Sequence, residues 1–552
     1  MSKARLELKS YRVSEIERFL ADRRFAVPEI QREFVWDPKK ACKLLDSIYH
    51  ELPIGTIMLW ETHRKNRHHL REHLHVLPEF DGGNKHIWFL LDGQQRVAVL
   101  FQAHRGDLIT LSNGKQINFE RLCFSLEAEN GQELFVYRRP VAGRFVSVRD
   151  ILAPRWKKNF RNLAQYKLKR LEKCRILLRR YKVPLLFIRT NRLEEVRESF
   201  IRINALGTPV SAADRAFARA SAFDMRHLVR QAKMGLAVGF QDLPDFAVLL
   251  AMAFMQGERG DVGERPVMAA IRKLEIRVDA SKSALSQFTK EWTRLRSALG
   301  KAVDYFRSNF SVLNRGFLPS DNMLIVFTMF LYWNRGLPNA TQKKEVRRWF
   351  WSTAIGQRYS GRGHRANILK DLEFFERMAR KGVARFRLEN RVHKSDLRRL
   401  EFTTRSSRTN AFLCLLLRQG PRYIENGDPI PLENISARAN VNQKHHIFPR
   451  ARLRSKGFSS KEYNSLCNIC FIVAEENQSI GKRPPCDYLT EAWEDYRHFC
   501  KVMKSHLIPA DDESGIWDED IRRGYRRFVR QRLDLICAAL EKEAGIKLFQ
   551  ED

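Results

Sequence analysis

The feature that most constrains the fold of this chain is the stretch Lys444–Pro449, whose sequence is Lys-His-His-Ile-Phe-Pro. Adjacent residues on a strand point to opposite sides, so one imidazole can hold a metal while the other takes a proton from water. The proline ends the pairing of the strand. The sequence therefore predicts a strand that ends at two chemically active histidines.

Two later segments continue this pattern. Asn464–Val473 predicts a turn that leads into a β-rich strand, and Asn477 begins a polar segment that predicts the start of a helix. The expected order is strand, strand, helix, with histidine and two asparagines converging. The alternative is that the histidines are ordinary loop residues and the asparagines are turn formers. The ordered pattern across residues 444–489 favours the catalytic interpretation.

This pattern resembles the HNH, or ββα-metal, nuclease superfamily, in the variant with His-His-Ile-Phe-Pro followed by two spaced asparagines. The resemblance implies that His446 is the general base and that Asn468 orients it. It also implies that His445 and Asn477 bind a divalent metal, with Mg²⁺ or Mn²⁺ expected. Family members more often carry Asp or Glu at the position of His445, although imidazole also binds several transition metals.

A second stretch, Ile87–Leu100, predicts a strand, a tight turn and a helix. Gly93 at the turn lets the backbone approach a ligand, and the helix start forms an anion site. Arg96 would add a donor for phosphate, and Asp92 could hold a metal or orient water. The alternative is a stable turn with an exposed helix start. The chain has no Walker A pattern, so nucleotide chemistry here would be of another kind.

This turn, Asp-Gly-Gln-Gln-Arg, is preceded by the segment 28–36 and by Pro53-Ile54-Gly55, and is followed by an Arg-x-Asn-x-x-Gly segment in 200–211. Together they resemble the N-terminal domain of GmrSD-type restriction proteins, which is related to the ParB and sulfiredoxin fold. The resemblance implies hydrolysis of GTP or another nucleoside triphosphate, with Asp92, Gln94 and Gln95 as catalytic residues. The nucleotide-binding residues that it implies are Gln31, Arg32, Asp92, Gly93, Gln94, Gln95 and Arg96.

The charge of the chain indicates a polyanionic partner. Lys and Arg number 99 against 64 Asp and Glu, a formal net charge of +35, and no membrane anchor is evident. Residues 155–182 carry twelve Lys or Arg and a single acid, Glu172, which predicts a basic amphipathic helix along a DNA backbone. A merely solvated face is the alternative. The residues expected to contact DNA are Lys167, Lys169, Arg170 and Lys173.

At 552 residues the chain exceeds one core and is expected to be a multi-domain α+β protein. We expect a ParB/sulfiredoxin-like domain over 1–225, a helical connector over 226–400, and an HNH-type nuclease domain with a helical tail over 401–552. The longest apolar runs are too short to cross a bilayer, and no signal segment is evident. A cytoplasmic protein, of bacterial origin, is expected.

The nine cysteines are expected to be reduced thiols. Whether Cys467, Cys470, Cys486 and Cys500 hold a zinc ion is left open at this point.

These features together predict an NTP-regulated, metal-dependent endonuclease that acts on modified DNA in defence against phage. The competing hypothesis is a non-cleaving reader or regulator of DNA modification whose nuclease site has decayed. The DNA mark is open between a modified base and the phosphorothioate backbone sensed by the SspE-like branch. The sequence also leaves open which nucleotide and which metal are used, whether one or both DNA strands are cut, and whether the chain forms a homo-oligomer.

Overall fold

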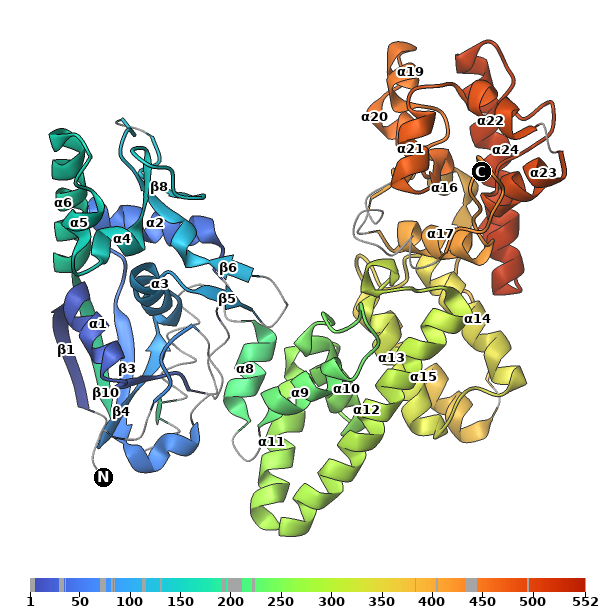
Figure 1. The fold of residues 1–552 in the computed structure, drawn as a ribbon. Helices are drawn as coiled ribbons and strands as arrows, with labels where there is room; N and C mark the ends of the chain where they lie inside the picture. The colour runs from blue at the N-terminus through green and yellow to red at the C-terminus, as the bar shows by residue number, and fades with distance from the viewer. Residues whose placement is uncertain are drawn as a thin grey trace. The chain divides into compact units, whose positions relative to one another are not determined.

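The computed structural model describes residues 5–28, 34, 36–69, 76–80, 83, 85–111, 116–129, 132–190, 195–196, 211–220, 224–382, 384–403, 406–431, 444–493 and 496–551. The chain forms two compact units, residues 1–226 and 227–552 (Figure 1). Each unit is described by itself below.

The first unit is built on a five-stranded mixed sheet with the order β1-β10-β3-β4-β2. β1 is antiparallel to β10, β10 is parallel to β3, β3 is antiparallel to β4, and β4 is parallel to β2. Side chains on the two faces of the sheet belong to separate apolar clusters. The strands are β1 (Arg5–Arg12), β2 (Phe25–Ala26), β3 (Ile57–His63), β4 (His86–Asp92) and β10 (Lys182–Arg189).

Helices pack on one face of this sheet around the larger apolar cluster. The longer ones are α1 (Val13–Ala21), α2 (Pro38–Tyr49), α3 (Gln94–Arg105) and α6 (Gln165–Arg180). α2 begins as its sequence predicts, because the Asp37 carboxylate accepts a 2.9 Å hydrogen bond from the Lys40 backbone N–H and Pro38 opens the helix. The remaining elements are η1 (Arg64–His69), β5 (Leu108–Thr110), β6 (Gln116–Asn118), η2 (Phe119–Arg121), β7 (Leu122–Ser125), β8 (Phe135–Tyr137), β9 (Phe145–Ser147), α4 (Val148–Leu152), α5 (Trp156–Asn159) and α8 (Ala212–Arg219).

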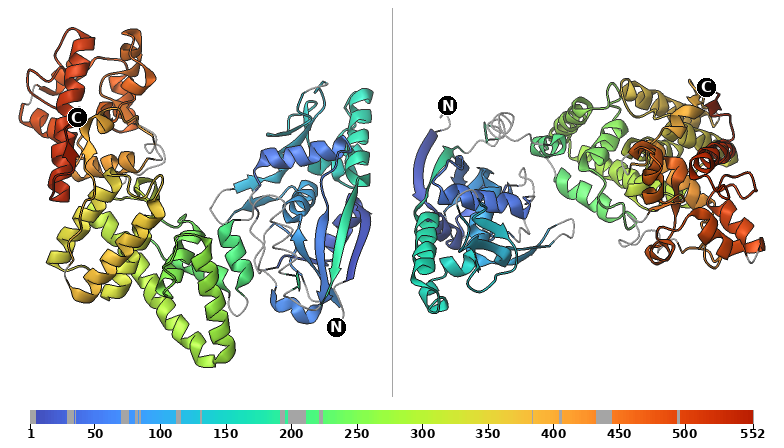
Figure 2. Two further views of the ribbon diagram at one scale, coloured as in Figure 1. Left: turned by 180° about the vertical axis from the view of Figure 1, so that it is seen from behind. Right: turned by 90° about the horizontal axis from the view of Figure 1, so that it is seen from above.

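The second unit is mainly helical. α13 lies at its centre and is buried from Met323 to Tyr332, while α11 and α12 lie side by side as a long helical pair (Figures 1 and 2). The helices of the N-terminal half of this unit are α9 (Met225–Met234, which spans the boundary), α10 (Asp245–Met255), α11 (Glu264–Ala280), α12 (Lys282–Phe310), η3 (Arg315–Phe317), α13 (Asp321–Asn334), α14 (Ala340–Ile355) and α15 (His364–Lys381). The aromatic run Trp349–Trp351 is fully buried, as a core role requires.

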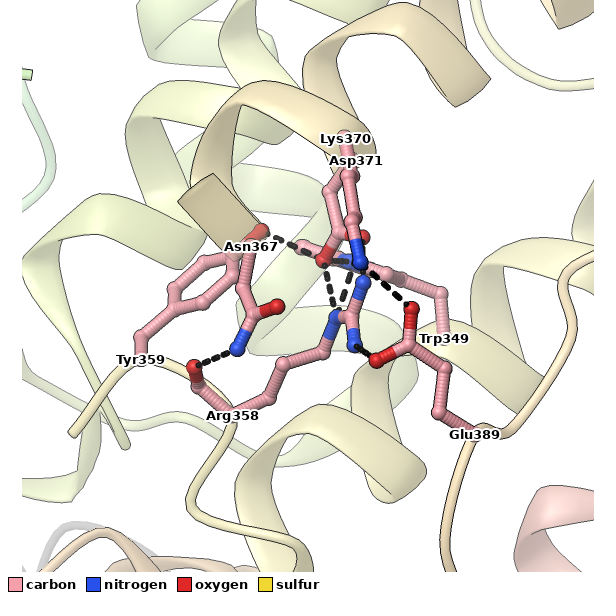
Figure 3. Close-up of polar contacts among 7 residues, drawn as sticks. All are labelled: Trp349, Arg358, Tyr359, Asn367, Lys370, Asp371 and Glu389. Carbon is pink, nitrogen blue, oxygen red and sulfur yellow. Dashed lines mark hydrogen bonds and ion pairs between the residues drawn. The ribbon is translucent and has the colours of Figure 1, made fainter. Parts of the chain in front are cut away.

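A buried polar cluster braces α14 against α15 (Figure 3). The Asp371 carboxylate accepts hydrogen bonds from Trp349 Nε1 at 2.9 Å and from the Tyr359 hydroxyl at 2.8 Å. It also accepts from Arg358 at 3.1 Å, and Arg358 in turn pairs with Glu389. Burial raises the pKa of Asp371 while the Arg358 guanidinium opposes that rise. The donors around this carboxylate therefore stabilise a charge that burial alone would neutralise.

The C-terminal half of the second unit packs on the same helices. Ser407 Oγ donates to the Ala354 carbonyl at 3.0 Å, Arg408 Nε donates to the Ile355 carbonyl at 2.7 Å, and α24 also packs on α14. The boundary expected after residue 400 therefore lies inside one compact unit. The elements are β11 (Val392–His393), α16 (Lys394–Arg398), α17 (Ser407–Arg418), β12 (Lys444–His446), α19 (Arg450–Ser455), α20 (Ser460–Tyr463), η4 (Leu466–Asn468), β13 (Ile469–Phe471), α21 (Ala474–Ile480), α22 (Pro485–Trp493), α23 (Tyr496–Ser505), α24 (Ile521–Ala544) and β14 (Phe549–Gln550).

Within the described ranges, no helix combines the length and the apolar character that a membrane crossing requires.

Candidate active site

The predicted order of strand, strand and helix is present in the C-terminal half of the second unit. β12 pairs antiparallel with β13, with His446 opposite Ile469, and α21 follows β13. α21 begins at Ala474, so Asn477 lies within the helix rather than at its start. The short helices α19 and α20 occupy the connection between the two strands.

His446 ends β12 and is partly exposed. Its Nε2 atom lies 3.0 Å from Oδ1 of Asn464. Burial lowers the pKa of His446 below its ordinary value, the Asn464 hydrogen bond opposes this shift, and the nearby Arg450 charge adds to it. The imidazole is therefore neutral at neutral pH, which is the form that can accept a proton.

Asn468 is fully buried and bonds to main chain. Its Oδ1 accepts from the Phe448 N–H at 2.9 Å, and its Nδ2 donates to the carbonyls of Phe448 at 3.1 Å and Tyr463 at 2.9 Å. Its own carbonyl accepts from the Ile447 N–H at 2.9 Å. Asn468 therefore fixes the chain immediately after His446, and any effect on the imidazole passes through that backbone.

Asn464 and Glu401 were missed as site residues by the sequence reasoning. Asn464 Nδ2 donates to Glu401 Oε1 at 3.2 Å and to Ser460 Oγ at 3.2 Å. Glu401 reaches this position because its segment pairs with the residues after α20, with a bridge between Glu401 and Ser465. Nothing local in the sequence links Glu401 to His446, since the link depends on this long-range pairing.

Arg532 of α24 is a further missed residue. It is fully buried, and its guanidinium donates to the carbonyls of Cys467 at 2.7 Å and Ile469 at 2.8 Å, on either side of Asn468. The same group donates to the carbonyls of His506 at 2.9 Å and Leu507 at 3.2 Å. Arg532 thus holds the η4–β13 segment that carries Asn468.

The expected metal ligands are described only in part. For His445 the structure describes the backbone, opposite Cys470 on β13, while its side chain lies outside the description. Asn477 is partly buried in α21. Among the residues whose placement is described, no group of three or more His, Cys, Asp or Glu side chains gathers in a metal-binding arrangement. The ligand roles of His445 and Asn477 stay predictions.

The second predicted site lies in the first unit, where β4 ends at Asp92 and α3 begins at Gln94. Gly93 between them has φ 87°, a left-handed conformation that suits glycine. The Asp92 side chain is 42% exposed, so it is accessible to a ligand. Gln94 and Gln95 are buried; Gln95 Oε1 accepts from the Trp36 N–H at 3.2 Å, while Gln94 Oε1 has no hydrogen-bond partner in the described structure.

Arg96 bonds within the protein. It donates to the carbonyls of Ile54 at 2.6 Å and Thr56 at 3.1 Å, and to Asp92 Oδ2 at 3.1 Å. Gly55 has φ 83°, a left-handed conformation that suits glycine, and a Cβ there would lie 2.5 Å from Arg96 Nη1, so a side chain would displace that guanidinium. Arg96 therefore joins the Asp-Gly-Gln-Gln-Arg turn to the Pro-Ile-Gly segment, a link that the sequence did not indicate. Gln31, Arg32 and residues 201–210 lie outside the described residues.

The basic helix predicted in 155–182 is present as α6, preceded by the short α5. Lys167 pairs with Glu127 at 2.9 Å and donates to the Gly143 carbonyl at 2.7 Å. Arg170 donates to the Ala128 carbonyl, and Lys173 lies over the Tyr49 ring. Lys169 is exposed. Three of the four residues expected to contact DNA therefore have partners inside the first unit.

Of the cysteines considered for zinc, Cys467 and Cys470 are buried, and Cys486 and Cys500 are partly exposed. Burial raises the pKa of Cys467 to about 11 and of Cys470 to about 12. Without a bound metal, these two thiols are therefore protonated at neutral pH.

The sequence of this chain is similar to that of known proteins. Residues 16–220 match the model described as the N-terminal domain of GmrSD restriction endonuclease. This match supports the GmrSD-type family, whose members are restriction endonucleases, and so favours a nuclease with DNA as its substrate. The chain is also similar to the uncharacterized protein MJ0686 of Methanocaldococcus jannaschii, with 22% identity over 93% of this chain and 95% of the relative.

Proposed function

We propose that this protein is a divalent-metal-dependent DNA endonuclease of the HNH type, regulated by a nucleoside triphosphate and directed at modified DNA. One observation supports the nuclease half most strongly. His446 is held neutral at the end of β12, within a strand-strand-helix arrangement whose connection is fixed by the buried Asn468. A neutral, positioned imidazole is suited to take the proton of an attacking water.

The metal would be held by His445 and Asn477. An imidazole and a carboxamide form a mixed nitrogen and oxygen donor set, which suits a transition metal such as Ni²⁺ better than Mg²⁺, which prefers oxygen ligands. When bound, the metal would supply positive charge at the scissile phosphate. The role of this chain's own residues is to hold His446 and to align the DNA.

A basic surface beside His446 supports DNA as the substrate. The segment 450–463 contains one acid, Glu462, and α24 contains none before Asp534. The two parts pack together, because Arg522 Nε donates to the Lys456 carbonyl at 2.7 Å and the Phe458 and Tyr525 ring centroids lie 5.0 Å apart. We call this the α19–α24 basic surface; its exposed members are Arg450, Arg452, Arg454, Lys456, Lys461, Arg522, Arg526, Arg527 and Arg530.

The α19–α24 basic surface is a stronger candidate for phosphate contact than α6. Lys167 and Arg170 of α6 are partly buried and bond to neighbouring loops. The guanidinium groups on α19 and α24 are exposed, and although Arg452 and Arg522 each donate Nε to a carbonyl, their outer N–H groups can form charge-assisted hydrogen bonds with phosphates. Arg450 is near enough to His446 to lower the pKa of that imidazole. Phosphates bound by this surface would therefore lie close to the proposed base.

The nucleotide half of the proposal rests on the Asp92 turn and the family match. The exposed Asp92 carboxylate and the start of α3 offer a place for a phosphate and its metal. In this structure Arg96 supports the turn, so we assign it to shaping the site rather than to direct phosphate contact. Modified DNA and nucleotide should then affect each other's binding reciprocally.

The experiment that tests this function is nicking of plasmid DNA by the full chain with Mg²⁺, Mn²⁺ or Ni²⁺, on plain and modified substrates, with and without GTP and ATP. We expect metal-dependent nicking that nucleotide changes. DNA binding without cleavage under every condition would instead support the non-cleaving reader. Absence of triphosphate hydrolysis with any DNA would remove the nucleotide half alone.

A further inference from the structure

We propose that Glu401 and Asn464 are positioning residues that hold His446 in the tautomer with its proton on Nε2, so that Nδ1 is the proton acceptor. The inference rests on the proposed nuclease function, because it names the nitrogen of His446 that would act. It concerns residues that lie outside the His-Asn-Asn pattern of the sequence.

The Glu401 carboxylate sets the orientation of the Asn464 carboxamide. An ionised carboxylate only accepts hydrogen bonds, so the Asn464 group that faces Glu401 Oε1 at 3.2 Å must be the NH₂. The second N–H of that group has an acceptor in Ser460 Oγ, also at 3.2 Å. The carboxamide is therefore fixed, and its oxygen faces His446.

The fixed carboxamide in turn sets the tautomer of the imidazole. Asn464 Oδ1 lies 3.0 Å from His446 Nε2, and a carboxamide oxygen only accepts, so Nε2 must be the donor. A neutral imidazole carries one proton, which leaves Nδ1 with a lone pair. In the part of the chain that the structure describes, no hydrogen bond to Nδ1 of His446 is found. Nδ1 is therefore available to a water or a substrate.

Backbone pairing holds the carboxylate in place. Glu401 bridges Ser465, the Phe402 N–H donates to the Asn464 carbonyl at 2.9 Å, and the Leu466 N–H donates to the Leu400 carbonyl at 3.0 Å. This pairing places Glu401 beside Asn464 without the help of a substrate. A preset tautomer avoids the need to move a proton within the imidazole before each reaction.

The test uses substitutions that keep shape and change only donors and acceptors. Glu401→Gln is close to isosteric, but its amide can present either a donor or an acceptor, so the Asn464 carboxamide is no longer fixed. In the double variant Glu401→Gln with Asn464→Asp, the hydrogen bond between the two side chains again has a single possible donor, because only the amide at position 401 can donate. The new carboxylate at position 464 can only accept, so it receives a hydrogen bond from the new amide at position 401 and another from His446 Nε2. The double variant also restores the net charge of the pair.

Two readouts separate the positioning role from a structural one. The first is the tautomer of His446, read from a long-range ¹H–¹⁵N spectrum of the full chain with ¹⁵N-labelled histidine at pH 8. The His446 signal is assigned by its absence from the spectrum of His446→Ala. The second is the nicking rate at saturating DNA and metal. A general base contributes on the order of 10²–10⁴-fold, so the rate should fall in proportion to the fraction of His446 that leaves the Nε2–H tautomer.

We expect an Nε2–H tautomer in the wild type, a mixture and a slower rate in Glu401→Gln, and recovery of both in the double variant. An Nδ1–H tautomer in the wild type, or an unchanged tautomer and rate in Glu401→Gln, would overturn the proposal. If the tautomer behaves as expected but no form nicks DNA, the nuclease function fails while the hydrogen-bond assignment stands.

Discussion

Replacement of Arg532 by methionine should destabilise the second unit strongly. Methionine has a similar length and no donor, so the carbonyls of Cys467, Ile469, His506 and Leu507 would lose the hydrogen bonds that Arg532 donates. A buried acceptor left without a donor costs about 1–3 kcal/mol. The substitution also removes a guanidinium whose burial itself costs several kcal/mol. Four unpaired acceptors cost roughly 4–12 kcal/mol, and the avoided burial of the guanidinium offsets several of these, so the net loss should be about 3–5 kcal/mol.

Differential scanning calorimetry of the full chain measures this loss. For a unit of the size of residues 227–552, the unfolding entropy makes 1 kcal/mol equal to roughly 1.5 °C, so its transition should fall by about 4–7 °C. Arg530→Met is the matched control, because Arg530 is exposed on the same helix and its loss should change stability by less than about 0.5 kcal/mol. An Arg532→Met transition equal to that of the control would refute the dependence of the four carbonyls on this guanidinium.

Three further results are expected. Asp371→Asn removes the buried charge partner of Arg358, which keeps only the more exposed Glu389, and should lower stability by about 3 kcal/mol in urea unfolding; an unchanged midpoint would show that the cluster of Figure 3 does not stabilise the packing of α14 on α15. Burial raises the pKa of Glu17 to about 7 from an ordinary 4.5, so the folded state binds more protons between these values and loses stability as pH rises through them. Glu17→Gln should therefore stabilise by up to about 3 kcal/mol at pH 8 and by almost nothing near pH 4.5, a difference that thermal unfolding at the two pH values would detect or exclude. Neutralising Arg452 and Arg526 together should flatten the slope of log affinity against log salt by about 0.9 per lost phosphate contact, and an identical slope would mean that the α19–α24 basic surface is only solvated.

Local sequence rules predicted the elements that carry both candidate sites. Asp37 and Pro38 predict the start of α2, Gly93 predicts the turn into α3, and the apolar residues after Asn468 predict β13. These signals are local because capping, left-handed turns and strand periodicity depend on residues close in the chain. The candidate general base His446 was singled out by the resemblance of residues 444–489 to the HNH pattern, and its role stays a prediction.

The distant residues that hydrogen-bond to these elements could not be predicted from local sequence. Glu401 approaches Asn464 through pairing of distant segments, and Arg532 reaches the carbonyls beside Asn468 from the C-terminal helix. Arg96 was expected to meet phosphate, yet it bonds to Ile54 and Thr56. Each of these contacts depends on how elements pack in three dimensions. Every residue has a backbone carbonyl, so the residue type does not indicate which carbonyl accepts a hydrogen bond from a distant side chain.

Single-turnover cleavage by His446→Ala shows whether His446 is the base of a DNA-cleaving site. The wild type, His446→Ala and the control His393→Ala, an exposed histidine on β11 in the same unit, would be compared at saturating metal, with DNA affinity measured in parallel. We predict that His446→Ala lowers the cleavage rate by on the order of 10²–10⁴-fold while DNA affinity and the control are unchanged. Cleavage by His446→Ala at the wild-type rate would contradict the claim.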